Sequence, residues 1–180
     1  MTVMIDPDTV ACREIAVFQG EFRISADPGV VMTTLLGSCV ATCLFDPVAR
    51  IGGMNHFLLA AQPSGRTPCE RYGLQAMEVL INGLLKLGAE KSRLEAKLFG
   101  GATMEGGMGR IGETNARFAL SFLDYEGIPC RASSLGGQQG RRLQFIPTTG
   151  AVRQRLMAKA PPIIRPTAPE PVGDILFFEE

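Results

Sequence analysis

Two apolar runs separated by a turn sequence constrain the fold of this chain more than any other feature. The first run, over 40–45, is short, apolar and partly β-branched, and the second is an apolar run over 51–59. Between them lies Asp46-Pro47-Val48-Ala49, with proline at the second turn position, where its fixed φ angle is favourable. The pattern predicts an antiparallel β-hairpin whose loop is 46–49.

This hairpin would bring the only histidine of the chain, His56, next to a cysteine, Cys39. If Phe45 pairs with Arg50 across the loop, counting outward places Cys39 directly opposite His56. Directly opposed side chains share a face of the sheet, with Cβ atoms about 4.5–5.5 Å apart, which allows a contact between sulfur and imidazole. A register slip of one residue would move the two side chains to opposite faces.

A cysteine and a histidine on one face are the minimum for a thiol nucleophile. The attacking species is the thiolate, and a neighbouring imidazole accepts the thiol proton and later protonates the leaving group. The alternative is structural, since an isolated cysteine is usually a small core residue and a lone histidine is more often structural than catalytic.

A cysteine hydrolase also needs a group that orients the imidazole and donors that stabilise an oxyanion. Polar side chains available near the histidine are Thr33, Thr34 and Asn55. Backbone N–H groups around Ser38 and Cys39 could form the oxyanion cradle, because the glycine before them permits a tight backbone.

These residues carry a resemblance to a known family. The run 29–41, which contains Gly37-Ser38-Cys39, closely resembles the chemoreceptor glutamine deamidase family, CheD, as do the turn Asp46-Pro47 and the segment 52–56. Further matches follow in the same order at 95–102 (Glu-Ala-Lys-Leu-Phe-Gly-Gly-Ala), 111–115 (Ile-Gly-Glu-Thr-Asn), Gly136-Gly137 and Arg141. Together they extend from about Phe18 to Met157.

The resemblance implies a cysteine hydrolase that converts particular glutamines in the cytoplasmic helices of chemotaxis receptors to glutamate through a thioester, without a cofactor. Cys39 then matches the nucleophile, His56 the general base and acid, and Thr33 the group that supports the histidine. Thr34 competes with Thr33 for this role, and because side chains alternate along a strand, only one of the two can share the face of the histidine.

Two other functions remain open from the sequence. Members of the resembled family also bind and stimulate a chemotaxis phosphatase, CheC, so the chain could be a binding regulator with little catalysis. It could also hydrolyse other amides or transfer an acyl group. Retention of Cys39, His56 and Thr33 favours catalysis.

Composition limits the cellular context. Eighteen basic and eighteen acidic residues cancel, which gives no electrostatic case for binding nucleic acid or an anionic membrane surface. The five cysteines are scattered and odd in number, unlike a disulfide framework, and indicate a reducing cytosol. No apolar stretch approaches the roughly 20 residues that cross a bilayer, and the N-terminus does not resemble a secretion signal. We therefore expect a cytoplasmic protein that meets receptors through protein contacts.

Periodicity predicts one domain over 1–159 that mixes strands and helices, followed by a proline-rich tail over 160–180. Helices are expected at about 70–87 and 113–125, and strands at 14–25 (one or two), 30–36, 40–45, 51–59, 94–99, 130–134, 143–147 and 152–157. Strands before and after the helices favour an α+β sandwich. The resemblance implies β-sheet layers flanked by helices, similar to the catalytic domain of bacterial deamidating toxins.

The segment before the second helix contains Gly107-Met108-Gly109-Arg110-Ile111-Gly112, which satisfies a dinucleotide-binding pattern. A nucleotide role is unfavoured, because about seven residues separate the expected strand from the first glycine of the pattern, unlike the tight junction of that motif. A surface loop is the simplest interpretation, and a substrate or partner contact through Arg110, Glu113 and Asn115 is the alternative. Cys39 and Cys43 make only a weak case for zinc, so no metal is expected.

Overall fold

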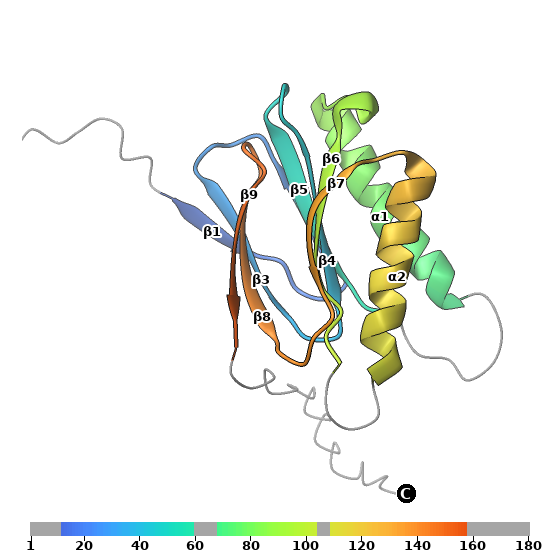
Figure 1. Cartoon of the computed structure of the whole chain (residues 1–180). Helices are drawn as coiled ribbons and strands as arrows, with labels where there is room; N and C mark the ends of the chain where they lie inside the picture. The colour runs from blue at the N-terminus through green and yellow to red at the C-terminus, as the bar shows by residue number, and fades with distance from the viewer. Residues whose placement is uncertain (1–11, 60–67, 104–108, 158–180) are drawn as a thin grey trace, which may run out of the picture.

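The computed structural model describes residues 12–59, 68–103 and 109–157, which form two packed β-sheets with two long helices on one side (Figure 1). The expected α+β class is confirmed. The strands are β1 (Arg13–Ala16), β2 (Phe22–Ser25), β3 (Val30–Leu36), β4 (Val40–Asp46), β5 (Ile51–Phe57), β6 (Glu95–Gly100), β7 (Cys130–Leu135), β8 (Arg141–Ile146) and β9 (Ala151–Leu156). The helices are α1 (Pro68–Leu87), a short 3₁₀ helix (Lys91–Arg93) and α2 (Gly109–Glu126). The tail over 160–180 lies outside the described residues.

Both sheets are mixed. The smaller has the strand order β1-β3-β8-β9, with β1 parallel to β3 and the other pairs antiparallel. The larger has the order β2-β5-β4-β6-β7, with only β6 and β7 parallel. Helices α1 and α2 both pack on the larger sheet, so the layers are sheet, sheet and helices (Figure 1). None of the helices in the described ranges is long and apolar enough to span a bilayer.

Two apolar cores follow from this layering. One lies between the larger sheet and the helices and contains Leu44, Phe57 and Leu80, and the other lies between the sheets and contains Met32, Cys43 and Phe145. Strands β4 and β5 are buried along their whole length because both of their faces are covered. Successive residues of these strands therefore alternate between the face toward the helices and the face toward the smaller sheet. A side chain on the face toward the smaller sheet is enclosed between the two sheets.

The hairpin forms, but its register differs from the expected one. Asp46 pairs with Ile51, so the loop is 47–50 rather than 46–49, and His56 lies opposite Ala41 instead of Cys39. Asp46 fixes this turn, since its Oδ1 accepts hydrogen bonds from the N–H groups of Val48 and Ala49, both at 2.9 Å. The residue of the first strand that lies opposite His56 is therefore displaced by two positions, from Cys39 to Ala41. Because side chains alternate with a period of two, Cys39 and His56 still lie on the same face of the sheet.

Helix α2 begins earlier than periodicity suggests, at Gly109 instead of about residue 113. Gly112, the last glycine of the dinucleotide-like pattern, lies in its first turn against the carbonyl oxygens of Gly101 and Ala102, where a Cβ atom would clash. This glycine therefore permits close packing of the helix against the chain that follows β6. The first part of the pattern lies outside the described residues.

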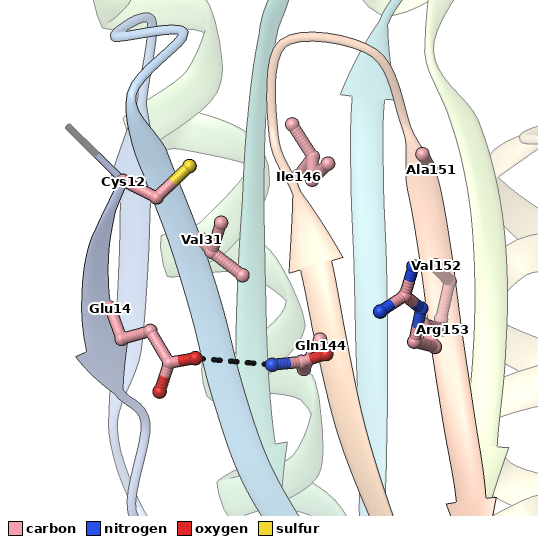
Figure 2. Close-up of a pocket in the computed structure, with 8 residues that line it drawn as sticks. All are labelled: Cys12, Glu14, Val31, Gln144, Ile146, Ala151, Val152 and Arg153. Carbon is pink, nitrogen blue, oxygen red and sulfur yellow. Dashed lines mark hydrogen bonds between the residues drawn. The ribbon is translucent and has the colours of Figure 1, made fainter. Parts of the chain in front are cut away.

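The outer face of the smaller sheet carries a pocket across β1, β3, β8 and β9 (Figure 2). Glu14 and Gln144 meet there, with the amide of Gln144 donating to Glu14 Oε1 at 3.1 Å. Gln144 alternates along β8 with the buried Leu143 and Phe145, so this pocket opens away from the core between the sheets. It is thus separate from Cys39 and His56.

Candidate active site

The two residues of the expected nucleophile–base pair lie on the same face of the larger sheet. Cys39 directly precedes β4 and packs against the core between the sheets, as does Ala41 two residues later. His56 lies opposite Ala41 on β5, so Cys39 and His56 are diagonal neighbours rather than directly opposed. Cα atoms of diagonal neighbours are about 7–8 Å apart, a separation that long or aromatic side chains can bridge.

The imidazole of His56 is held from the opposite sheet. Its Nδ1 atom lies 2.9 Å from the hydroxyl of Thr34 on β3 and 3.3 Å from the carbonyl oxygen of Val17. The Thr34 hydroxyl donates its proton to the same Val17 carbonyl, at 2.7 Å. The hydroxyl and the carbonyl can therefore only accept at Nδ1, and the proton of a neutral imidazole must reside on Nδ1.

This tautomer leaves the lone pair of Nε2 as the basic site of His56. Nε2 is buried and has no hydrogen-bond partner among the described residues. Burial lowers the pKa of His56, an effect that the Val17 carbonyl partly offsets. The imidazole is consequently neutral near pH 7 and able to accept a proton.

Cys39 is half-buried, and its thiol is also neutral. Removal from water raises its pKa to about 11, while its own backbone N–H acts in the opposite direction. The thiol donates a hydrogen bond to Oε1 of Gln19 at 3.4 Å. The structure thus shows a resting state in which Gln19, and not His56, is the hydrogen-bond partner of the sulfur.

The connection between β3 and β4 is held by its carbonyl groups. Those of Gly37, Ser38 and Cys39 accept hydrogen bonds from Ala102 N at 2.9 Å, Asn115 Nδ2 at 2.8 Å and Gly101 N at 2.7 Å, respectively. Because a trans peptide directs its C=O and the following N–H in opposite directions, the N–H groups of Ser38 and Cys39 point away from these partners. Within the described residues, neither of these two N–H groups donates a hydrogen bond to another backbone group.

The structure distinguishes the two threonines. Thr34 is buried and reaches His56, whereas Thr33, the residue expected from the resemblance, is half-buried on the opposite face of β3 with Val31 and Leu35. The expected contact between Thr33 and His56 is therefore corrected to Thr34. Asn55 faces the helices, where it binds Thr42 N at 3.0 Å and the Ala76 carbonyl at 3.0 Å.

The three polar residues expected to contact substrate or partner differ in their surroundings. Asn115 is fully buried and joins Leu59 N (2.7 Å) to the Ser38 carbonyl (2.8 Å), so it supports the Cys39 segment and is not a surface contact. Arg110 and Glu113 are exposed on α2, and Glu113 pairs with Arg117 at 3.0 Å. No cluster of histidine, cysteine and carboxylate side chains suited to a metal ion occurs within 12–59, 68–103 and 109–157.

Sequence reasoning missed the segment 17–21, which supplies both the Val17 carbonyl and the Gln19 carboxamide. Its hydrogen bonds to the site come from a turn between two short strands on different sheets. A glycine at position 20 indicates a turn. Nothing in the local pattern indicates that this turn contacts Cys39.

Relatives that match most of the chain carry a common name, probable chemoreceptor glutamine deamidase CheD. The protein from Caulobacter vibrioides (strain NA1000 / CB15N) is 49% identical over 187 residues, covering 99% of this chain and all of that protein. The relative from Rhizobium leguminosarum bv. trifolii (strain WSM2304) is 54% identical over 147 residues, covering 80% of each chain. That from Agrobacterium fabrum (strain C58 / ATCC 33970) is 50% identical over 179 residues, covering 93% of this chain and 98% of that protein.

A family model and a solved structure complete the comparison. The crystal structure of Neisseria meningitidis protein NMB0706, family-model DUF152, has a TM-score of 0.45 and 10% identity, covering 71% of this chain and 64% of that one. The model described as CheD chemotactic sensory transduction matches residues 58–156, beginning just after His56, while the Caulobacter relative extends the match to nearly the whole sequence. This chain belongs to the CheD family.

Proposed function

We propose that this protein is a glutamine deamidase that hydrolyses the side-chain carboxamides of specific chemoreceptor glutamines, with Cys39 as nucleophile and His56 as general base and acid. The names of relatives at about 50% identity support the substrate class. The observation that carries the chemistry is the unpartnered, basic Nε2 of His56, placed on the same face of the sheet as the half-buried Cys39 thiol.

The first half of the reaction forms a thioester. After the thiol turns from Gln19 toward His56, Nε2 removes its proton and the sulfur attacks the carboxamide carbon, moving the carbonyl electron pair onto oxygen. The outward-directed N–H groups of Ser38 and Cys39 stabilise this oxyanion. When the tetrahedral intermediate collapses, the C–N bond breaks and imidazolium protonates the departing ammonia.

The second half returns the enzyme to its starting state. His56 takes a proton from water, the hydroxide attacks the thioester carbon, and the C–S bond breaks. The thiolate regains its proton from His56, and the product is glutamate. Throughout, the Thr34 hydroxyl and the Val17 carbonyl accept hydrogen bonds from Nδ1–H and therefore also stabilise the imidazolium form between the two proton transfers.

A neutral Cys39 thiol and a neutral His56 imidazole suit this site better than a permanent thiolate–imidazolium pair. Burial disfavours charge on both Cys39 and His56 in the free protein. Proton transfer is consequently coupled to the approach of the carboxamide, when donors for the new negative charge become available. The free thiol should be correspondingly inert toward other electrophiles.

The wider context forms part of the same proposal. The protein acts in the cytoplasm on the helices of chemotaxis receptors, and residues 1–159 form one catalytic domain. A CheC-type phosphatase partner and a likeness of the sandwich to deamidating-toxin catalytic domains are predictions from the family resemblance. Binding of a purified phosphatase and superposition on a toxin domain, respectively, test them.

Mass spectrometry of receptor cytoplasmic fragments tests the proposed function. Incubation with this protein should convert particular glutamines to glutamate and release an equivalent amount of ammonia, and the Cys39→Ala variant should not do so. Exposed Cys130 provides the matched control, because Cys130→Ala should retain full activity. If purified receptor fragments from the same host remain unmodified by the wild-type protein, the proposed substrate class is wrong.

A further inference from the structure

The side chain of Gln19 lies at the nucleophile. Its Oε1 atom accepts the hydrogen bond of the Cys39 thiol at 3.4 Å, although the two residues come from different parts of the fold. Gln19 occupies a tight turn in which Glu21 N donates to the Phe18 carbonyl at 2.9 Å, and Gly20 adopts a positive φ of 87°. Gln19 is an exposed residue, so its side chain does not serve to fill the core.

Backbone hydrogen bonds attach this turn to the strands of the site. Before the turn, Val17 N donates to the Thr33 carbonyl on β3 at 2.8 Å. Within it, Gly20 N donates to the His56 carbonyl at 2.7 Å, and the Glu21 carbonyl accepts from His56 N at 3.0 Å. The backbone that carries Gln19 is thereby fixed relative to the imidazole, which favours a stationary role over a lid that must leave.

We infer that Gln19 is a catalytic residue whose side-chain N–H group stabilises the negative charge that develops at Cys39 during the reaction. The inference rests on the proposed function. A carboxamide has an acceptor oxygen and a nitrogen with two donors, and its terminal torsion is soft. In the resting state the carboxamide oxygen accepts the hydrogen bond that the Cys39 thiol donates. Rotation about the terminal torsion presents Nε2, which donates first to the thiolate and then to the oxyanion of the tetrahedral intermediate.

Gln19 complements the donors supplied by the backbone. A second donor from the segment 17–21 would act on the thiolate and then on the oxyanion from a direction different from that of the Ser38 and Cys39 N–H groups. The Gln19 side chain forms no covalent bond in this role and is unchanged at the end of the cycle. Glutamine suits the task because its amide stays uncharged at every pH, whereas a glutamate would place an anion beside the thiolate.

A competing role is that of an internal substrate, since Gln19 presents the same chemical group as a receptor glutamine. Attack by Cys39 would then release ammonia and leave glutamate at position 19. This outcome would replace the carboxamide at position 19 by a carboxylate, which has no N–H group to donate to the thiolate. Peptide mass spectrometry of the wild-type protein distinguishes the two roles directly.

The test compares Gln19→Ala and Gln19→Glu with a control variant, Gln144→Ala. Gln144 lies on the outer face of the smaller sheet, in the pocket that Figure 2 shows. For receptor deamidation we expect Gln19→Ala to lower kcat by about 10²-fold with little change in KM, and Gln19→Glu to lower it further. Iodoacetamide alkylation of Cys39, followed against pH without receptor, should shift to higher pH in both variants. Gln144→Ala should match the wild-type protein in both assays.

An unchanged kcat and alkylation profile in Gln19→Ala would overturn the inference, as would faster deamidation or a glutamate found at position 19 of the wild-type protein. Circular dichroism and thermal melting should show that the variants fold normally, because the side chain is exposed. If even the wild-type protein does not modify receptors, the proposed function fails, yet the alkylation profiles still decide whether Gln19 donates to the thiolate.

Discussion

The Nδ1 atom of His56 on β5 and the hydroxyl of Thr34 on β3 lie 2.9 Å apart, which joins the two sheets at the candidate site. His56 belongs to the larger sheet, but its imidazole is held by Thr34 of the smaller sheet. The Val17 carbonyl accepts hydrogen bonds from both side chains. Sheet packing, and not the hairpin alone, determines the orientation of the imidazole. Any change that moves β3 relative to β5 should reduce activity before it unfolds the protein.

Replacing Thr34 tests this orientation. Thr34→Val keeps the shape of the side chain but removes the hydroxyl, so Nδ1 loses its closer acceptor and kcat for receptor deamidation should fall roughly 10- to 100-fold. Thr33→Val, on the opposite face of β3, is the matched control and should stay within about twofold of the wild-type protein. Thr34→Ser should recover most of the activity. Equal losses in the two valine variants would contradict the assignment of Thr34.

The pH dependence of the free thiol tests the neutral resting state. Because burial raises the pKa of Cys39 to about 11, the rate of iodoacetamide alkylation should be low at pH 7 and continue to rise up to about pH 11. A thiolate–imidazolium pair would instead give rapid alkylation with a plateau near neutral pH. Peptide mapping must confirm that Cys39, rather than an exposed cysteine, is the residue followed.

The decline of kcat/KM at low pH should report the protonation of His56. Its lowered pKa keeps the imidazole neutral below the ordinary value, so kcat/KM should hold as the pH falls to about 6.5 and decline only at lower pH. Measurements must be restricted to the range in which circular dichroism shows a folded protein. A decline that begins well above pH 7 would contradict this description of the base.

Removing Asn115 should damage both the site and the fold. Asn115→Ala leaves the Ser38 carbonyl and Leu59 N without their partner, at a cost of about 1–3 kcal/mol in the free energy of unfolding. The Cys39 segment then loses one of its three carbonyl anchors, so kcat should fall by about 10²-fold. Chemical denaturation and deamidation kinetics measure the two effects. A stable variant with normal kcat would show that the anchor is dispensable.

Asp46 should be important for the stability of the fold. Its buried carboxylate accepts from Glu90 N at 2.9 Å and pairs with Arg93 at 2.8 Å, in addition to holding the turn after β4. Asp46→Ala should therefore reduce the free energy of unfolding by about 3 kcal/mol. Glu113→Ala, which breaks only the exposed pair with Arg117, should change it by less than about 1 kcal/mol.

The same carboxylate gives the protein a pH-dependent stability. The partners of Asp46, chiefly Arg93, hold its pKa below the ordinary value against the opposing effect of burial. The contribution of the Asp46 carboxylate to the free energy of unfolding is thus fully present above about pH 4 and is lost as the pH falls below that. Comparing acid denaturation of the wild-type protein and Asp46→Ala should show the difference between them shrinking at low pH. A constant difference would contradict the linkage.

Much of the architecture could be predicted because local patterns agree with the tertiary structure. Periodicity and turn residues predicted the strands and both helices, and they placed Cys39 and His56 on one face. The exact register could not be predicted, since it depends on Asp46, whose carboxylate binds both the turn and a distant segment. Loop length alone does not reveal such an anchor.

The rest of the site depends on contacts between distant segments. Alternation shows that only one of Thr33 and Thr34 can face His56, but which one does so depends on how the smaller sheet packs. Asn115 has the same sequence signature whether it faces solvent or Ser38, and Gln19 reaches Cys39 only because the turn carrying it is fixed to β3 and β5. These positions require the three-dimensional structure.

The central claim, that Cys39 attacks the glutamine carboxamide, is tested most directly by trapping the thioester. Rapid acid quench of the protein with a receptor fragment, followed by intact mass and peptide mapping, should reveal an adduct of the fragment less one ammonia, attached to Cys39. The adduct and the glutamate product should both be absent with Cys39→Ala. Continued formation of glutamate by Cys39→Ala at the wild-type rate would contradict the account.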